Sequence, residues 1–172
     1  SYFSLIGGYK DLFKHKPSGN YLHGVTFEEI TAFDIRMEYA HLGLTESHDS
    51  LQQMMNLINM LLLAKDVDNA KIVLEQYETL VLKHLSDTSL DYGICKLSRG
   101  IIDMMEGKPE PAEMNLLGAE SIIGNAMGID NDYMKTTYRY LNNLYARWKK
   151  PEKAIEYRDK FLGVKQSLSK QE

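Results

Sequence analysis

The stretch YLNNLYARWKKPEKAIEYRDKFL, residues 140–162, places a proline in the middle of an otherwise helical pattern. Pro151 lacks the amide hydrogen that a helix interior needs, so one continuous helix through it is unfavourable. At the first position of a helix this amide would have no partner anyway, and Glu152 beside it suits the positive end of the helix. The stretch therefore predicts two antiparallel helices joined by a turn near 149-151.

The same turn recurs earlier in the chain at a constant spacing. Three segments align without gaps: KDVDNAKIVLEQYE (65–78), GKPEPAEMNLLGAE (107–120) and KKPEKAIEYRDKFL (149–162). Ala70, Ala112 and Ala154 then fall 42 residues apart, twice over. A small residue in this column allows two helices to cross closely. The alignment predicts three helix-turn-helix units that stack, because one helix pair cannot bury its own apolar face.

Helical periodicity fills the rest of the chain. Apolar residues recur at spacings of three and four ahead of the turns, as Met54, Leu57 and Leu61 do in the first unit. The predicted helices span 2-15, 26-43, 48-64, 67-85, 89-106, 109-127, 131-148 and 151-169. Thr26 and Glu29 read as a capping box for the second helix, and Gly128 as the stop of the sixth.

These patterns predict an all-α fold, an α-solenoid of antiparallel helix pairs with a repeat of about 42 residues. Residues 1-44 are expected to form an N-terminal helical cap or a degenerate repeat, because Glu28 stands where the aligned units have alanine. Residues 45-172 are expected to form three repeats in one continuous domain. A length of 172 residues suits a single core of this kind.

Composition excludes several classes of function. The net charge is -4 and basic residues are interspersed with acids, so direct binding to nucleic acid is not expected. The run MMNLINMLLLA is about half the roughly 20 residues that span a bilayer, which predicts no membrane segment. Cys95 is the one cysteine and cannot form an intramolecular disulfide, so a reducing, cytoplasmic setting is expected.

No arrangement of residues predicts catalysis. The five histidines never pair at helical spacing with an acid between them, so a helical zinc motif is absent. Cys95 has no histidine near it in sequence and is more simply a buried apolar residue than a nucleophile. The short glycine segments lack the spacing of a phosphate loop. We expect no enzymatic activity, no metal and no cofactor.

The third unit resembles the tetratricopeptide repeat. Its large, leucine, aromatic, alanine and aromatic positions are matched in order by Tyr138, Leu141, Tyr145, Ala154 and Tyr157. In the middle unit Asp103 and Arg99 stand where the family has an aromatic residue and a leucine. The resemblance covers about residues 45-170, and the long unit is similar to repeats of bacterial signalling proteins, among them transcription regulators, diguanylate cyclases and sensor kinases.

This resemblance implies a concave groove, lined by the first helix of each unit, that binds a peptide or protein segment. The candidate groove residues are Gln52, Met55, Asn59, Leu97, Ile101, Met104, Met105, Thr136, Arg139, Asn143 and Arg147. Asparagines suit a peptide backbone, arginines suit carboxylates, and methionines adapt to varied side chains. The chain is then expected to be the sensory or regulatory part of a larger bacterial signalling protein.

The apolar middle of this face is equally consistent with core, covered by the N-terminal helices or by a second copy of the chain. In that alternative the repeats form a structural scaffold or homodimerisation module that positions an output domain. A large apolar patch left exposed favours the groove, whereas the same patch buried in a two-fold contact favours the dimer.

Overall fold

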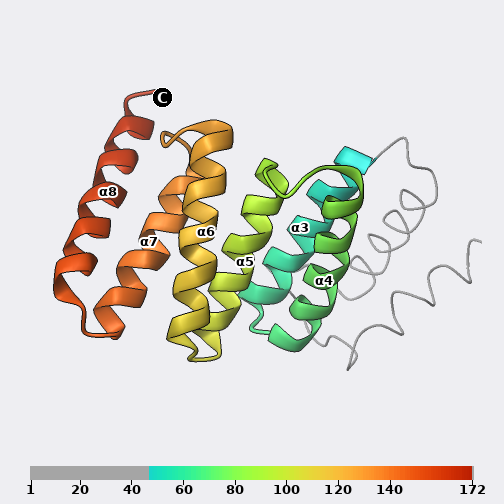
Figure 1. The fold of residues 1–172 in the computed structure, drawn as a ribbon, viewed down its shortest axis with the longest axis horizontal. Coiled ribbons are helices and arrows are strands. Elements are labelled where there is room, and N and C mark those ends of the chain that lie inside the picture. The colour runs from blue at the N-terminus through green and yellow to red at the C-terminus, as the bar shows by residue number, and fades with distance from the viewer. Residues whose placement is uncertain (1–46, 172) are drawn as a thin grey trace, which may run out of the picture. The chain divides into compact units, whose positions relative to one another are not determined.

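The computed structural model describes residues 47–171, and every regular element in this range is an α-helix (Figure 1). The helices are α3 (Ser47–Leu63), α4 (Val67–His84), α5 (Leu90–Met105), α6 (Pro109–Met127), α7 (Asp132–Arg147) and α8 (Pro151–Ser169). Each begins and ends within one residue of its prediction, so the all-α prediction is confirmed for these residues. The predicted helices 2-15 and 26-43, the capping box and the 1-44 cap lie outside the described residues.

The chain divides into two compact units, one ending at Leu80 and the other beginning at Val81. The first unit contains α3 and most of α4, and the second contains α5 to α8. The prediction of one continuous domain over 45-172 stays a prediction.

The three turns within helix pairs share one backbone geometry. Lys65, Gly107 and Lys149 have φ angles of 60°, 71° and 56°, all in the left-handed region. In each turn the next amide donates to the carbonyl five residues earlier, over 2.8 to 2.9 Å, as Lys150 does to Tyr145. This is the Schellman arrangement, which satisfies carbonyls at a helix end. The 42-residue recurrence of the sequence is thus also a recurrence of backbone structure.

The starts of the following helices recur as well. Pro109 and Pro151 occupy the first turn of α6 and α8, as predicted. The amides of Ala70, Ala112 and Ala154 donate to the carbonyls four residues earlier over 3.0 to 3.1 Å, and all three alanines are buried. The prediction that Gly128 ends α6 is also confirmed, since Gly128 caps this helix with a φ of 78°.

The helices of the second unit pack in sequence order. In Figure 1, α5 lies along α6 and α7 along α8, while α6 contacts α7. Helix α5 also contacts α7 directly. Their shared core consists of Leu97, Ala112, Leu116, Ala119, Ile123, Met134, Tyr138, Leu141, Leu144, Tyr145, Ala154, Tyr157 and Val164.

Two glycines allow α5 to approach α6 closely. A Cβ atom built at Gly93 would lie 2.7 Å from the Cγ1 atom of Ile123, and one at Gly100 would lie 2.7 Å from the side chain of Leu116. Both distances are shorter than side-chain atoms tolerate. The absence of a side chain at Gly93 and Gly100 therefore has a steric reason.

The first unit buries apolar side chains on both of its helices, including Leu57 and Leu61 on α3 and Leu74 and Tyr77 on α4. Asn69 is also fully buried, but its side-chain amide donates to Asp66 over 3.0 Å in the turn before α4. This hydrogen bond offsets the cost of burying a polar group.

Candidate functional site

One face of α7 is polar and faces solvent. The candidate residues Thr136, Arg139, Asn143 and Arg147 are spaced by three and four, so they form one stripe along the helix. Arg139, Asn143 and Arg147 are exposed and Thr136 is half-buried. The Asn143 amide makes no hydrogen bond with any residue of the described part of the chain. These groups are available to a ligand.

The four candidates on α5 differ in exposure, and Leu97 is the most deeply buried of them. Leu97 is 5% exposed and belongs to the core, so its side chain is not available to a ligand. Ile101 and Met104 are half-buried against the same core, and Met105 is 42% exposed. Helix α5 contacts α7, and Met104 of α5 lines the same pocket as Arg147 of the polar stripe.

The remaining candidates lie on α3, in the first unit. Met55 is buried and Asn59 is exposed. Gln52 falls within the helix, but its side chain lies outside what the structure describes. Their participation in a shared groove with α5 and α7 stays a prediction.

A small open pocket lies where the turn between α5 and α6 meets the end of α7. Its volume is about 190 Å³, and its lining residues are Met104, Gly107, Lys108, Pro109, Leu144, Arg147 and Trp148. Two of these, Met104 and Arg147, are candidates predicted from the sequence. Met104, Leu144 and Trp148 supply apolar surface, and Lys108 and Arg147 supply positive charge. We name this hollow the turn pocket.

The charges of the turn pocket are not balanced by acids in its lining. Lys108 pairs with Glu106 at 3.7 Å between Nζ and Oε1. The Arg147 guanidinium makes no ion pair or hydrogen bond within residues 47–171. Lys150 adds a third cation nearby, because its Nζ lies 3.7 Å from the centroid of the Trp148 ring. The pocket therefore combines buried and half-buried apolar side chains with exposed cations.

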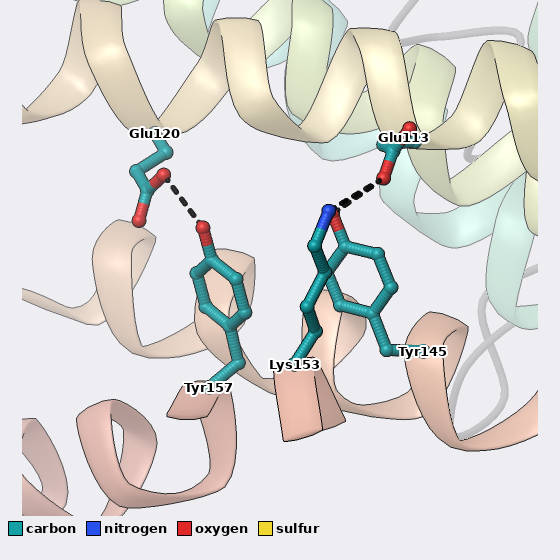
Figure 2. A network of polar contacts seen from close by, with 5 residues as sticks. All are labelled: Glu113, Glu120, Tyr145, Lys153 and Tyr157. Carbon is teal, nitrogen blue, oxygen red and sulfur yellow. Dashed lines mark hydrogen bonds and ion pairs between the residues drawn. The ribbon is translucent and has the colours of Figure 1, made fainter. Parts of the chain in front are cut away.

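A separate set of polar side chains joins α6 to α7 and α8 (Figure 2). The Tyr145 hydroxyl donates to Glu113 Oε2 over 2.7 Å, and Lys153 Nζ lies 3.9 Å from the same oxygen. Both Glu113 and Tyr145 are largely removed from water, which makes such a hydrogen bond stronger than at the surface. We name these three residues the first polar layer.

The arrangement repeats seven residues further along α6. The Tyr157 hydroxyl donates to Glu120 Oε1 over 3.0 Å, as Figure 2 shows, and Lys160 Nζ lies 3.8 Å from Glu120 Oε2. Glu113 and Glu120 are seven apart, as are Lys153 and Lys160, so each trio occupies one level of the bundle. We name the second trio the second polar layer.

The two tyrosines keep their protons in these layers. Burial raises the pKa of Tyr145, and the hydrogen bond to Glu113 raises it further. Burial likewise raises the pKa of Tyr157, with a further contribution from the negative charge of Glu120. A tyrosine that ionises less readily is a poor general base, so the layers are better suited to holding helices together than to proton transfer.

Sequence reasoning missed the turn pocket and both polar layers. Pro109 was assigned only as a helix start, and Lys108 was given no role, although two aligned turns with adjacent lysines carried the signal. Glu113 and Glu120 were given no role. The matching seven-residue spacings on two helices were the available sign that these charges meet.

Searches of this chain against protein-family models, curated proteins and solved structures returned no match. Within residues 47–171, no helix has the length and apolar character to cross a membrane. In the same residues, no group of three or more histidine, cysteine, aspartate or glutamate side chains is placed to hold a metal ion.

Proposed function

We propose that this chain is a non-enzymatic binding module of the tetratricopeptide type, an α-solenoid that recognises a peptide or protein segment. The observation that carries the proposal is the recurrence of one turn geometry at Lys65, Gly107 and Lys149, 42 residues apart. Repeated helix pairs of this kind stack and create extended surfaces. The contact between α5 and α7 supports this arrangement, since the first helices of successive pairs adjoin.

The chemistry of α7 supports a peptide as the ligand. Arg139 and Asn143 are exposed one turn apart. An amide can both donate to and accept from a peptide backbone, and a guanidinium binds carboxylates. Met104 of α5 lines one pocket together with Arg147, the last residue of the same stripe, and offers an adaptable side chain there. Polar anchors beside a pliable apolar surface fit an extended segment better than a rigid small molecule.

The cellular role is proposed from the resemblance of the repeat. We propose that the module is the sensory or regulatory part of a larger bacterial signalling protein and acts in the cytoplasm. Binding of a peptide would then bias an output domain, and the coupling would equal the difference in affinity between its two states. Binding measured with and without the neighbouring domain of the complete protein tests this step.

The deciding experiment combines a peptide library with a matched pair of variants. Arg139→Gln with Asn143→Ala should weaken binding by on the order of 2 kcal/mol, because both groups would contact the ligand. Thermal unfolding should change little, because both side chains are exposed and surface substitutions have small effects. Arg158→Gln, an exposed change on α8, is the control and should bind like wild type. Equal binding by all variants contradicts the proposed face.

A second function, self-association, is favoured by apolar residues on α8. Ile155 and Leu162 are 48% and 49% exposed and seven residues apart, so they lie on the same side of the helix. In this alternative the module is a dimerisation scaffold for an output domain. Sedimentation of wild type beside Ile155→Lys with Leu162→Lys separates the two: a dimer that these changes dissociate supports the scaffold. A monomer that binds no library peptide contradicts both functions.

A further inference from the structure

We propose that the turn pocket binds one large apolar side chain of a peptide, and that Arg147 binds an acidic side chain adjacent to it in the same peptide. This inference rests on the proposed function and specifies its ligand as an acidic segment with an apolar anchor. It assigns the recognition to the turn end of α5 and α7, around Met104, Leu144, Arg147 and Trp148.

The size of the turn pocket fits one side chain. An engineered cavity of about 150 Å³ holds benzene, and the turn pocket measures about 190 Å³. Among its lining residues Leu144 is buried, Met104 and Trp148 are half-buried, and Arg147 is exposed. A leucine or phenylalanine side chain would therefore leave water for apolar surroundings on entering. Such burial contributes roughly 25 cal/mol for each Å² of apolar surface removed from water.

The charge of the turn pocket opposes that of the chain. The chain has a net charge of -4, yet the pocket lining has two cations and no carboxylate. Lys108 is partly neutralised by Glu106, whereas the Arg147 guanidinium is unpaired within the described residues. A guanidinium with both edges free can bind a carboxylate through two parallel hydrogen bonds. A negative charge on the ligand is thus the complement of this site.

The position of Arg147 fixes where that negative charge lies in the ligand. Arg147 lines the same hollow as Trp148, so its reach is limited to the residue in the pocket and its sequence neighbours. Lys149 and Lys150 follow directly in the chain, and Lys150 is held over the Trp148 ring. A second acidic side chain in the ligand would form an ion pair with Lys149 or Lys150. We therefore commit to an acidic side chain next to the apolar anchor.

Trp148 makes the test direct, because it is the one tryptophan of the chain. The probe is a blocked seven-residue peptide with a central leucine followed by two glutamates, and with glycine and serine elsewhere. Its addition should change the Trp148 fluorescence to saturation. The peptide with glutamines in place of glutamates, and the peptide with alanine in place of leucine, should each bind about tenfold more weakly or worse.

Protein variants then locate the contact. Arg147→Gln should weaken the acidic peptide about tenfold or more and leave the glutamine peptide unchanged, because the lost partner is already absent from that peptide. Arg158→Gln is the matched control, since it removes the same charge from an exposed position on α8, outside both the turn pocket and the candidate face of α7. Equal losses for both variants overturn the proposal, because they indicate a diffuse effect of charge.

The remaining outcomes separate this inference from the proposed function. Binding of other library peptides that depends on Arg139 but not on Arg147 overturns the turn pocket and leaves the binding module intact. No fluorescence change and no heat with the acidic peptide also overturns the turn pocket, while the library still tests the module. N-acetyl-leucine that binds as tightly as the peptide overturns the peptide as occupant and identifies a small carboxylic acid instead.

Discussion

Asp103 accepts a hydrogen bond from the side-chain amide of Asn115 across α5 and α6, at 2.7 Å between Oδ2 and Nδ2. Their counterparts 42 residues later are Tyr145 and Tyr157, whose rings stack with centroids 5.7 Å apart. Asp103 therefore departs from the repeat together with its partner, and a polar pair replaces an aromatic pair at the same crossing. The departure that weakens the resemblance in the middle unit is locally compensated.

This compensation predicts an energetic coupling between Asp103 and Asn115. In a double-mutant cycle of Asp103→Ala and Asn115→Ala, the interaction energy should be about 1 kcal/mol or more, because a half-buried hydrogen bond to a charged group is lost. The exposed pair Arg158 and Asp159, 3.3 Å apart on α8, is the control and should show about 0.5 kcal/mol or less. Denaturant unfolding measures both cycles. Equal couplings would contradict the assignment.

Two glycines on neighbouring helices should respond to alanine with opposite signs. Gly118→Ala should raise the free energy of unfolding by about 0.5–1 kcal/mol, because its Cβ atom meets nothing within 4 Å and alanine favours helix. Gly100→Ala should lower it by about 1–3 kcal/mol, because the new methyl group meets the fully buried Leu116. Urea midpoints compare the pair. A gain at Gly100 would mean that α5 and α6 separate without cost.

Replacing Lys149, whose backbone is left-handed in the turn before α8, should increase the stability of the fold. Lys149→Gly should raise the free energy of unfolding by about 0.5–1 kcal/mol, because glycine adopts a φ of 56° without the steric penalty of a side chain. Gly107→Ala, at the equivalent position of the middle turn, should lower it by a similar amount. Lys150→Gly is the control and should give no gain, since Lys150 has a φ of -115°. A thermal melt of each variant shows whether its stability has increased or decreased.

The polar layers predict a loss of stability in alkali. Tyr145 and Tyr157 have pKa values raised above their ordinary value of 10, so this contribution is complete below pH 10 and is lost as the pH rises further. Above pH 10 the unfolded chain releases protons that the folded chain keeps, which favours unfolding. The slope reaches about 1.4 kcal/mol per pH unit for each such tyrosine.

Phenylalanine variants test this pH dependence. Tyr145→Phe with Tyr157→Phe should be less stable than wild type at pH 8, because Glu113 and Glu120 lose donors. Between pH 10 and 11, however, the variant should lose stability more gradually than wild type. Denaturant titrations at pH 8, 10 and 11 measure both the stability at pH 8 and its loss in alkali. Parallel pH profiles would show that the two hydroxyls ionise normally in the folded chain.

The helices of this protein were predictable because their signals are local. Pro109 and Pro151 can only begin a helix, and the alanine columns reveal which turns are equivalent. The left-handed residue was less apparent, since lysine occupies it in two turns of three and the sequence rule favours glycine there. Backbone hydrogen bonds from Lys108 and Lys150 fix this conformation whichever residue occupies it.

The candidate site was predictable only in part. The spacing of Arg139, Asn143 and Arg147 identified an exposed stripe, because one helix obeys one periodicity. Leu97 was placed in the same groove by register, yet it belongs to the core. Periodicity gives the face of a residue on its own helix and leaves open which neighbouring helix covers that face. The turn pocket depends on such a neighbour, so Trp148 and Lys108 escaped notice.

The two polar layers resist sliding of one helix past another. If α6 moved by one turn along the α7 and α8 pair, the translation of about 5.4 Å would carry Glu113 and Glu120 beyond the reach of both hydroxyls. Glu110 precedes Glu113 by three residues, but no acid stands one turn from Glu120, since Leu116, Leu117, Ile123 and Gly124 occupy those positions. Shear along α6 is therefore unfavourable. If these helices move when a ligand binds, we expect α6, α7 and α8 to rotate together as one rigid block.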